Sequence, residues 1–379
     1  MKKILLLSLV IIVNAIQCLG QQDTLFWFSP PKIPNSITTT ETRLAVKAFN
    51  QSATVTVSLP ANNSFTPQTI TIPANSIQEF DFSTLFTTLY PSASGIQNNG
   101  VKISSNQPIS TEWIINNTTY KEDFILKGQM ALGSDFYVPM QKHWSVSSTG
   151  NAGFTIVASV DNTTVLITPK TAASTSTSSS VSATFSVLLQ KGQTFFVNKS
   201  NLGDATSLAG SIVSSNQPVA VTVYEHGTGT SSCHDLIGDQ LISSNFLGTT
   251  FVLPKTSTED RVFVMAVENG TQISMGGGAV TANLSWGETA ILTPTADFSY
   301  LQSNKKVYVY HVAARDCEFS ASLVPNATCA GSYTANLVRK NSNNFSIFLY
   351  TRTGFENNFT INNAPIDLST VTFQPVLGA

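Results

Sequence analysis

The sequence has few charged residues. Asp, Glu, Lys and Arg together make up 11% of its 379 residues, whereas an ordinary globular protein has about a quarter. It has no basic run or stripe, and its formal net charge is −2, so the electrostatic footprint of a nucleic-acid-binding protein is missing. The sequence contains 23 Phe, 9 Tyr and 4 Trp, and so many aromatic side chains to bury argue against a disordered chain. Ser, Thr, Asn and Gln supply the polarity, which is typical of exposed strand faces.

The sequence also lacks the motifs of common enzymes. It contains no nucleophile elbow, phosphate-binding loop, dinucleotide-binding glycine pattern or zinc-binding histidine pair on a helix. Sustained helical periodicity is missing too, and only residues 83–89 and 235–241 are candidates for short helices. We therefore expect no enzyme, no cofactor and no metal site.

The first 20 residues predict a secretory signal peptide. A basic start is followed by an apolar stretch at residues 4–12 and by a cleavage site between Gly20 and Gln21. A retained signal anchor is one alternative, but the apolar stretch is shorter than the ~20 residues that span a bilayer. A lipid anchor on Cys18 is another, although a glutamine precedes it where a small residue is expected. We expect a secreted or cell-surface protein with no membrane span after cleavage.

Cysteine is scarce. After cleavage only Cys233, Cys317 and Cys329 remain. Exported proteins form disulfides, and an odd number of cysteines leaves one thiol over. Cys317 and Cys329 lie close together in the sequence, with a Pro-Asn pair between them, so we expect a disulfide between these two. Cys233 would then be free or paired with another chain, and the sequence alone does not fix the connectivity.

Internal repetition is the most informative feature that is present. Three segments begin with an apolar strand, a polar turn and a second strand, which is a hairpin pattern. A further strand follows with Asn75, Gly192 or Gly287 in its middle, and both residue types tolerate a positive φ. The three hairpin segments are residues 44–59, 154–168 and 262–275.

Each copy ends on a related motif. Residues 103–109 and 213–219 share Ser-Ser-Asn-Gln-Pro, and residues 302–307 form a degenerate third version. We interpret the Ser-Asn part as a turn and the alternating apolar residues after it as a strand. A fourth copy is expected to begin at residues 345–350, with residues 359–361 as its hairpin partner. The chain stops inside this copy at Ala379, which suggests a C-terminally truncated sequence.

The repeats predict an all-β fold of tandem β-sandwich-like units, three plus a partial fourth, with a repeat of roughly 90–110 residues. A larger continuous β-fold such as a propeller is the alternative, although the repeat is long for a four-stranded blade. The predicted domains are a signal peptide at residues 1–20, units at residues 21–130, 131–245 and 246–330, and the partial unit at residues 331–379.

The segment at residues 224–240 concentrates charged and metal-ligating residues in this charge-poor chain. We interpret it as a structured loop that leaves a strand, and a ligand or partner contact as its functional alternative. A metal or thiol site fits less well, because adjacent Cys233 and His234 cannot easily turn toward each other and the spacing matches no standard zinc pattern. The candidate ligand-contact residues are Tyr224, Glu225, His226, Cys233, His234 and Asp235.

A series of different motifs is spread in order along nearly the whole mature chain. They lie at residues 26–31, 133–139, 214–221, 233–240 and 248–254, then in the two-cysteine segment 317–331 and in the Phe-Gln-Pro-Val stretch from residue 373. Together they resemble the N-terminal domain of the IgG Fc-binding protein family, which also occurs in exported bacterial proteins. The resemblance implies immunoglobulin binding in animal mucus proteins and a surface or adhesion role in bacterial members. It assigns no residue here to that activity.

We therefore expect a secreted or cell-surface binding or adhesion module, without catalytic activity, that recognises an extracellular protein or glycan. A structural spacer that presents a downstream domain is the alternative. A hydrolase centred on Cys233 and His234 is a further hypothesis.

Overall fold

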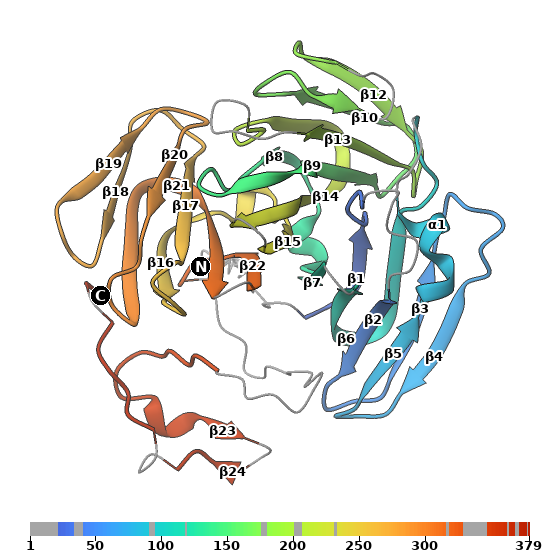
Figure 1. Cartoon of the computed structure of the whole chain (residues 1–379). Coiled ribbons are helices and arrows are strands. Elements are labelled where there is room, and N and C mark those ends of the chain that lie inside the picture. Colours follow the sequence, from blue (N-terminus) through green and yellow to red (C-terminus); the bar gives the residue numbers. More distant parts are fainter. Residues whose placement is uncertain are drawn as a thin grey trace, which may run out of the picture.

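The computed structural model describes residues 22–33, 41–90, 95–117, 120–175, 180–200, 207–230, 233–315, 318–328, 347–361, 364–367, 371–376 and 378–379. Within them the chain forms three large antiparallel sheets (Figure 1). The predicted all-β class with repeated sandwich-like units is confirmed. The predicted signal peptide, its cleavage site at Gly20 and Gln21, and the Cys317–Cys329 bridge lie outside the described residues.

The first sheet, which we call unit 1, contains seven strands. Two short helices, η1 (Ser83–Leu85) and α1 (Phe86–Leu89), follow its fifth strand, where the sequence predicted a short helix. The strands are β1 (Asp23–Phe28), β2 (Glu41–Ala48), β3 (Ala53–Ser58), β4 (Gln68–Ile72), β5 (Ile77–Asp81), β6 (Val101–Asn116) and β7 (Lys121–Ile125).

The second and third sheets, units 2 and 3, repeat this strand order, and unit 2 adds only the short strand β11. Unit 2 consists of β8 (Gly133–Tyr137), β9 (Ser145–Ala158), β10 (Thr163–Thr168), β11 (Ser174–Thr175), β12 (Phe185–Leu189), β13 (Thr194–Ser200), β14 (Ile212–Thr230) and β15 (Cys233–Gln240). Unit 3 consists of β16 (Gly248–Pro254), β17 (Arg261–Ala266), β18 (Thr271–Met275), β19 (Val280–Leu284), β20 (Thr289–Leu292), β21 (Phe298–Arg315) and β22 (Glu318–Leu323). The predicted domain boundaries themselves remain predictions.

One long strand in each unit belongs to two layers. In unit 1 the first part of β6 pairs with β1 and β3, and its second part pairs with β2 and β7. Strands β14 and β21 divide in the same way. The apolar residues of both layers of unit 1 face each other in one core. Each unit is therefore a sandwich whose two layers share a strand. The hairpins predicted at residues 44–59, 154–168 and 262–275 are wrong, because the long strand of each unit lies between the two strands and pairs with both.

The repeated Ser-Ser-Asn-Gln-Pro motif lies where the long strand passes from one layer to the other. The predicted turn there is wrong, because β6 and β14 continue through the motif with only a shift of register against β1 and β8. The Asn106 side chain explains this continuity, since its Oδ1 accepts a hydrogen bond from the Thr54 backbone N–H at 2.8 Å. The side chain thus replaces a missing ladder bond at the irregularity.

Three residues that the sequence placed in the middle of a strand each lie in a turn between two strands. Asn75, Gly192 and Gly287 have φ angles of 58°, 80° and 74°. The backbone N–H of each donates to a carbonyl at the end of a neighbouring strand, at Phe49, Ala158 and Ala266 respectively. A positive φ is therefore needed at this one position in all three units.

The units pack in sequence order around a common centre, where Figure 1 shows β7, β15 and β22. Unit 2 packs on unit 1 through Trp27, which contacts Val157 and Ala220 and whose carbonyl accepts a hydrogen bond from Gln240 Nε2 at 2.7 Å. Unit 3 packs on unit 2 through Tyr308, whose hydroxyl donates to the Ile242 carbonyl at 2.6 Å. One close approach is repeated, since Gly100 of unit 1 lies against the Gly192 carbonyl of unit 2, and Gly210 of unit 2 lies against the Gly287 carbonyl of unit 3.

The described C-terminal residues form little regular structure. A small hairpin joins β23 (Thr360–Ile361) to β24 (Ala364–Pro365), after the short helix η5 (Glu356–Asn358). Residues 347–350 form no strand, so their predicted pairing with residues 359–361 is wrong, and the fourth unit remains a prediction. None of the helices in the described part of the chain is long and apolar enough to span a membrane.

Candidate functional site

The segment singled out from the sequence is a β-hairpin, so its interpretation as a loop leaving a strand is wrong. Tyr224, Glu225 and His226 belong to β14, while Cys233, His234 and Asp235 belong to β15, which pairs with it. The same pairing overturns the helix expected at residues 235–241. The local apolar spacing there favoured a helix, but the ladder to β14 satisfies the backbone instead.

Two of the predicted contact residues lie at the contact with unit 1. The Tyr224 ring is fully buried and belongs to the apolar core of that unit. The centroid of the His226 ring lies 3.9 Å from the centroid of the Tyr120 ring. Neither nitrogen of His226 has a hydrogen-bond partner. Burial lowers the pKa of His226 to about 4, so the ring is neutral at physiological pH. Neither side chain can touch a ligand at the surface.

Glu225 points into unit 2. Its two carboxylate oxygens accept hydrogen bonds from the backbone N–H and the side-chain Nε2 of Gln141, both at 3.0 Å. Burial raises the pKa of Glu225 to about 7, although these hydrogen bonds oppose the shift. The carboxyl group therefore holds the chain between β8 and β9 in place and is not available to a partner.

Three carboxylates accept hydrogen bonds from backbone N–H groups along one edge of β22, the innermost strand of unit 3. Asp235 Oδ2 accepts from the Phe319 N–H at 2.8 Å, Glu122 Oε2 from the Ala321 N–H at 3.2 Å, and Asp239 Oδ2 from the Leu323 N–H at 2.8 Å. An unpaired strand edge presents a row of such donors. Acidic side chains of units 1 and 2 therefore act in place of a neighbouring strand for unit 3.

Burial affects the acidity of these three groups. It raises the pKa of Asp235 to about 6 and that of Glu122 well above its ordinary value, while hydrogen bonds from the neighbouring backbone oppose both shifts. It also raises the pKa of Asp239, against the opposing charge of Lys127, whose Nζ lies 2.5 Å from Asp239 Oδ1. Among the described residues, the centre of the molecule thus combines several buried acids with Lys127.

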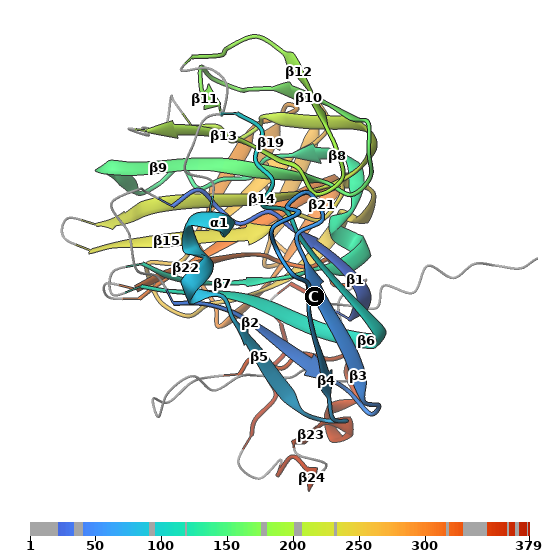
Figure 2. The same ribbon diagram turned by 90° about the vertical axis from the view of Figure 1, so that its right-hand side faces the viewer.

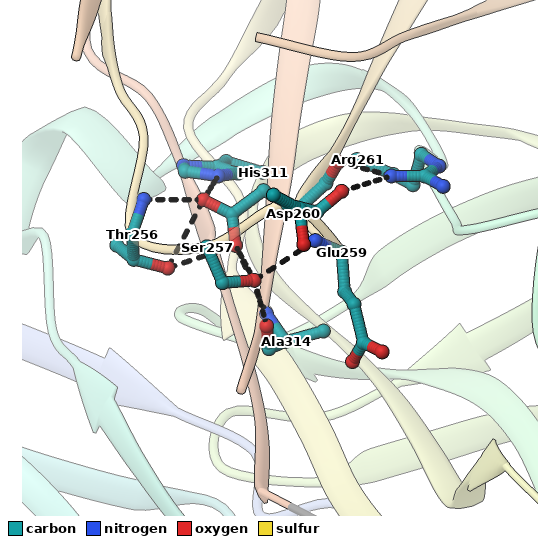
Figure 3. A network of polar contacts seen from close by, with 8 residues as sticks. Thr256, Ser257, Glu259, Asp260, Arg261, His311 and Ala314 are labelled. Atoms are coloured by element: carbon teal, nitrogen blue, oxygen red, sulfur yellow. Dashed lines mark hydrogen bonds and ion pairs between the residues drawn. The ribbon is translucent and has the colours of Figure 1, made fainter. Parts of the chain in front are cut away.

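A second polar network lies in unit 3 (Figure 3). The Asp260 carboxylate accepts hydrogen bonds from Thr256, Ser257 and the Ala314 N–H, and His311 Nε2 lies 3.3 Å from it. Burial would raise the pKa of Asp260, but these hydrogen bonds, led by that of His311, outweigh it and hold the pKa below its ordinary value.

The network does not form a nucleophile–base pair. The Ser257 hydroxyl donates to the Ala314 carbonyl, and no hydrogen bond joins it to His311. A nucleophile must lie within hydrogen-bond reach of its base. The network therefore fixes the segment before β17 against β21.

The described residues offer no ligand-sized cavity among their two best-formed hollows. One is lined by apolar residues around Ile242, Phe251 and Tyr308, the other by residues around Lys47 and Glu112, and each has a volume of about 10 Å³. That is room for about one water molecule. In the same part of the chain, no group of three or more His, Cys, Asp and Glu residues could hold a metal ion.

A broad exposed surface lies on three peripheral pairs of strands. The hairpins β3/β4, β10/β12 and β18/β19 lie at the periphery in Figure 1, and the first two also do so in Figure 2. None of these six strands contains a charged residue. Thr56 and Thr69 join hydroxyls across the first hairpin at 2.9 Å, and Leu166 and Leu188 are 46% and 52% exposed on the second. We call these three pairs of strands the outer hairpins.

Sequence reasoning missed the residues that hold the centre together. Glu122 lies in β7 and Lys127 follows this strand, and neither stood out because their partners come from other units. The scarcity of charge was the available signal, since a charge inside an apolar stretch of such a chain needs a buried partner.

Comparison with known proteins gives one informative match. A family model described as "IgGFc binding protein" matches residues 122–379, about two thirds of the chain. No curated protein matches. A solved structure titled "anti-sigma factor domain-containing protein" shares 8% sequence identity over 80% of this chain and 81% of that chain, at a TM-score of 0.14. So low a score carries no argument about the fold.

Proposed function

Because the chain belongs to the IgGFc binding protein family, we propose that it is an extracellular, non-catalytic binding or adhesion module for a protein ligand. The observation that carries this proposal is the family match, which spans units 2 and 3. The small hollows favour recognition through an open surface, since sites for small molecules are usually concave and enclosed.

We place the contact surface on the outer hairpins. Their faces combine hydroxyl groups with isolated exposed leucines and have no charge, which suits a neutral protein or glycoprotein surface. Three copies on one molecule allow several weak contacts to act together. The buried residues Tyr224, Glu225 and His226 are left out of this surface.

The direct test measures binding of the chain without residues 1–20 to immobilised immunoglobulin Fc, with and without its glycans, by biolayer interferometry. We expect binding that changes little with salt concentration, because screening acts on charges. Loss of binding after deglycosylation would identify the glycan as the ligand. Failure to bind Fc, a panel of extracellular glycoproteins and a glycan array would refute the proposal.

A pair of matched variants tests the surface. Leu188→Lys introduces a charge on an outer hairpin, and we expect it to weaken binding by about tenfold, or roughly 1.4 kcal/mol. Ile96→Lys adds the same charge at a residue that is 39% exposed outside the outer hairpins, and it should bind like the unmodified chain. Equal binding by both variants would show that this hairpin is not part of the contact surface.

The repeated packing of units favours a spacer as a second candidate. Successive units contact one another through equivalent faces, as stacked repeats do. A chain that fails every binding assay but folds cooperatively would support this candidate.

A further inference from the structure

Lys127 and Asp239 make an unusual contact at the centre of the molecule. Lys127 follows β7 in the connection from unit 1 to unit 2, and Asp239 lies in β15. Lys127 Nζ lies 2.5 Å from Asp239 Oδ1, and the two side chains are only 11% and 4% exposed. The other lysine and arginine ion pairs of the described residues are much more exposed.

We propose that Lys127 and Asp239 form an intramolecular amide bond between Nζ and Cγ, which links unit 1 covalently to unit 2. Nothing in the proposed binding function requires this bond, and the two proposals stand or fall separately.

The reaction is a condensation that balances without any added reagent. The Lys127 ammonium first passes a proton along the existing hydrogen bond to Asp239 Oδ1, which gives an amine and a carboxylic acid. The Nζ lone pair then attacks Cγ, and the bond from Cγ to Oδ1 breaks. The second proton leaves Nζ for the departing hydroxyl, so one ammonium and one carboxylate become one amide and one water molecule.

The reacting atoms are held in position. A nitrogen this close to Oδ1 lies within about 3–4 Å of Cγ, near the separation from which bonds form in well-oriented intramolecular reactions. The Lys127 backbone N–H donates to Gln240 Oε1 at 2.8 Å, and its Nζ also donates to the Ile125 carbonyl at 3.2 Å. Both ends of the lysine are therefore fixed against β15 and β7.

The negative charge that develops during attack also has a donor. Asp239 Oδ2 accepts the backbone N–H of Leu323 at 2.8 Å. This oxygen becomes the oxyanion of the tetrahedral intermediate and then the amide oxygen, so the same donor stabilises the intermediate and the product. The donor comes from unit 3, which means that the bond forms only after all three units have docked.

The surroundings favour the neutral forms that react. Burial lowers the pKa of Lys127 and raises the pKa of Asp239, while the charge of each partner opposes the shift of the other. A buried pair of charges carries a desolvation cost that a neutral amide avoids. The adjacent Phe124 and Leu126 side chains are fully buried and limit the access of water that would reverse the reaction.

Intact-mass spectrometry of the denatured, reduced chain without residues 1–20 decides the matter. We expect a mass lower than that of the sequence by one water molecule. Tryptic digestion should yield one cross-linked species that joins residues 122–142 to residues 200–255. The full sequence mass, with residues 122–127, 128–142 and 200–255 recovered as separate peptides after cleavage at a free Lys127, would overturn the proposal.

Three variants exclude other sources of a mass deficit. Lys127→Arg should restore the missing water, whereas cyclisation of an N-terminal glutamine loses ammonia and persists in this variant. Asp239→Asn should still form the bond but lose ammonia in place of water. Lys121→Arg, at an exposed lysine that begins β7, should keep the deficit. If a variant fails to fold, the mass of the unmodified chain still decides.

Discussion

The Asn216 side chain caps the Thr164 backbone, with Oδ1 accepting the N–H at 2.8 Å. The same bond joins Asn106 to Thr54 and Asn304 to Gln272, also at 2.8 Å. The third unit keeps the asparagine although the rest of its motif has diverged. The asparagine is thus the part of the motif that the fold needs, because it supplies an acceptor where the long strand changes layers.

Replacing this acceptor should destabilise unit 2. Asn216→Ala leaves the Thr164 N–H without its partner, and we expect the free energy of unfolding to fall by about 1 kcal/mol, since water replaces the bond in part at this exposed position. Urea denaturation measures the change. Gln217→Ala, at the next exposed residue, is the control and should have almost no effect. Equal effects of the two substitutions would contradict the role of the asparagine.

The positive φ at the central turn predicts which residues Gly287 tolerates. The equivalent Asn75 has a φ of 58°, and nothing outside the turn lies closer than 3.8 Å to a Cβ added at Gly287. Gly287→Asn should therefore cost less than about 1 kcal/mol, and Gly287→Val about 2 kcal/mol or more, because β-branched residues rarely adopt this conformation. Thermal denaturation of the two variants tests the ranking, and a more stable valine variant would refute it.

Glu225 should make stability depend on pH. Burial raises its pKa from 4.5 to about 7, so the folded chain holds a proton that the unfolded chain has released between these values. Its contribution to stability is therefore full below pH 4.5 and is lost as the pH rises through 7. The loss amounts to about 3 kcal/mol.

Glu225→Gln keeps the hydrogen-bonding shape without titrating. Its unfolding free energy should fall less between pH 5 and pH 7.5 than that of the unmodified chain, while the exposed Glu79→Gln control should follow the unmodified chain. Parallel pH profiles for Glu225→Gln and the unmodified chain would show that Glu225 does not titrate in this range. The comparison within one background also cancels the opposing contribution of His226.

The pH dependence of stability that His226 contributes has the opposite sign. Burial lowers its pKa from 6.5 to about 4, so its contribution to stability is present above pH 6.5 and is lost as the pH falls toward 4. His226→Phe removes two unpaired nitrogens and keeps a ring against Tyr120. The variant should be about 2 kcal/mol more stable than the unmodified chain at pH 5 and at least as stable at pH 7.5. Ligand binding should not change. A loss of binding in a folded variant would show that His226 does contribute to the contact surface.

The sequence revealed what repeats locally. The strands themselves, the positive φ at Asn75, Gly192 and Gly287, and the all-β class follow from residues close together in the chain. The hairpins expected at residues 44–59, 154–168 and 262–275 did not form, because the partner of both strands is the long strand, which lies much further along the sequence. The continuity of β14 did not follow, because the acceptor for the Thr164 N–H lies 52 residues away at Asn216. The helix expected at residues 235–241 failed for the same kind of reason, since only pairing with β14 reveals a strand.

The candidate site was predicted only in part. The concentration of charge around Glu225 and Asp235 did indicate an important region, but it suggested a surface loop where the structure has the centre of the molecule. Glu122 and Asp239 bind backbone groups of unit 3, and no pattern within their own segments shows such a partner. Contacts between units depend on how sheets pack, which hydropathy patterns do not determine.

Strands β6, β14 and β21 each belong to both layers of their unit, and this has a mechanical consequence. Neither layer can detach while the other remains folded, because both would lose the same strand. A pulling force applied to one layer must break the hydrogen bonds of the shared strand on both sides together. Each unit should therefore rupture in a single step under load, as one cooperative element.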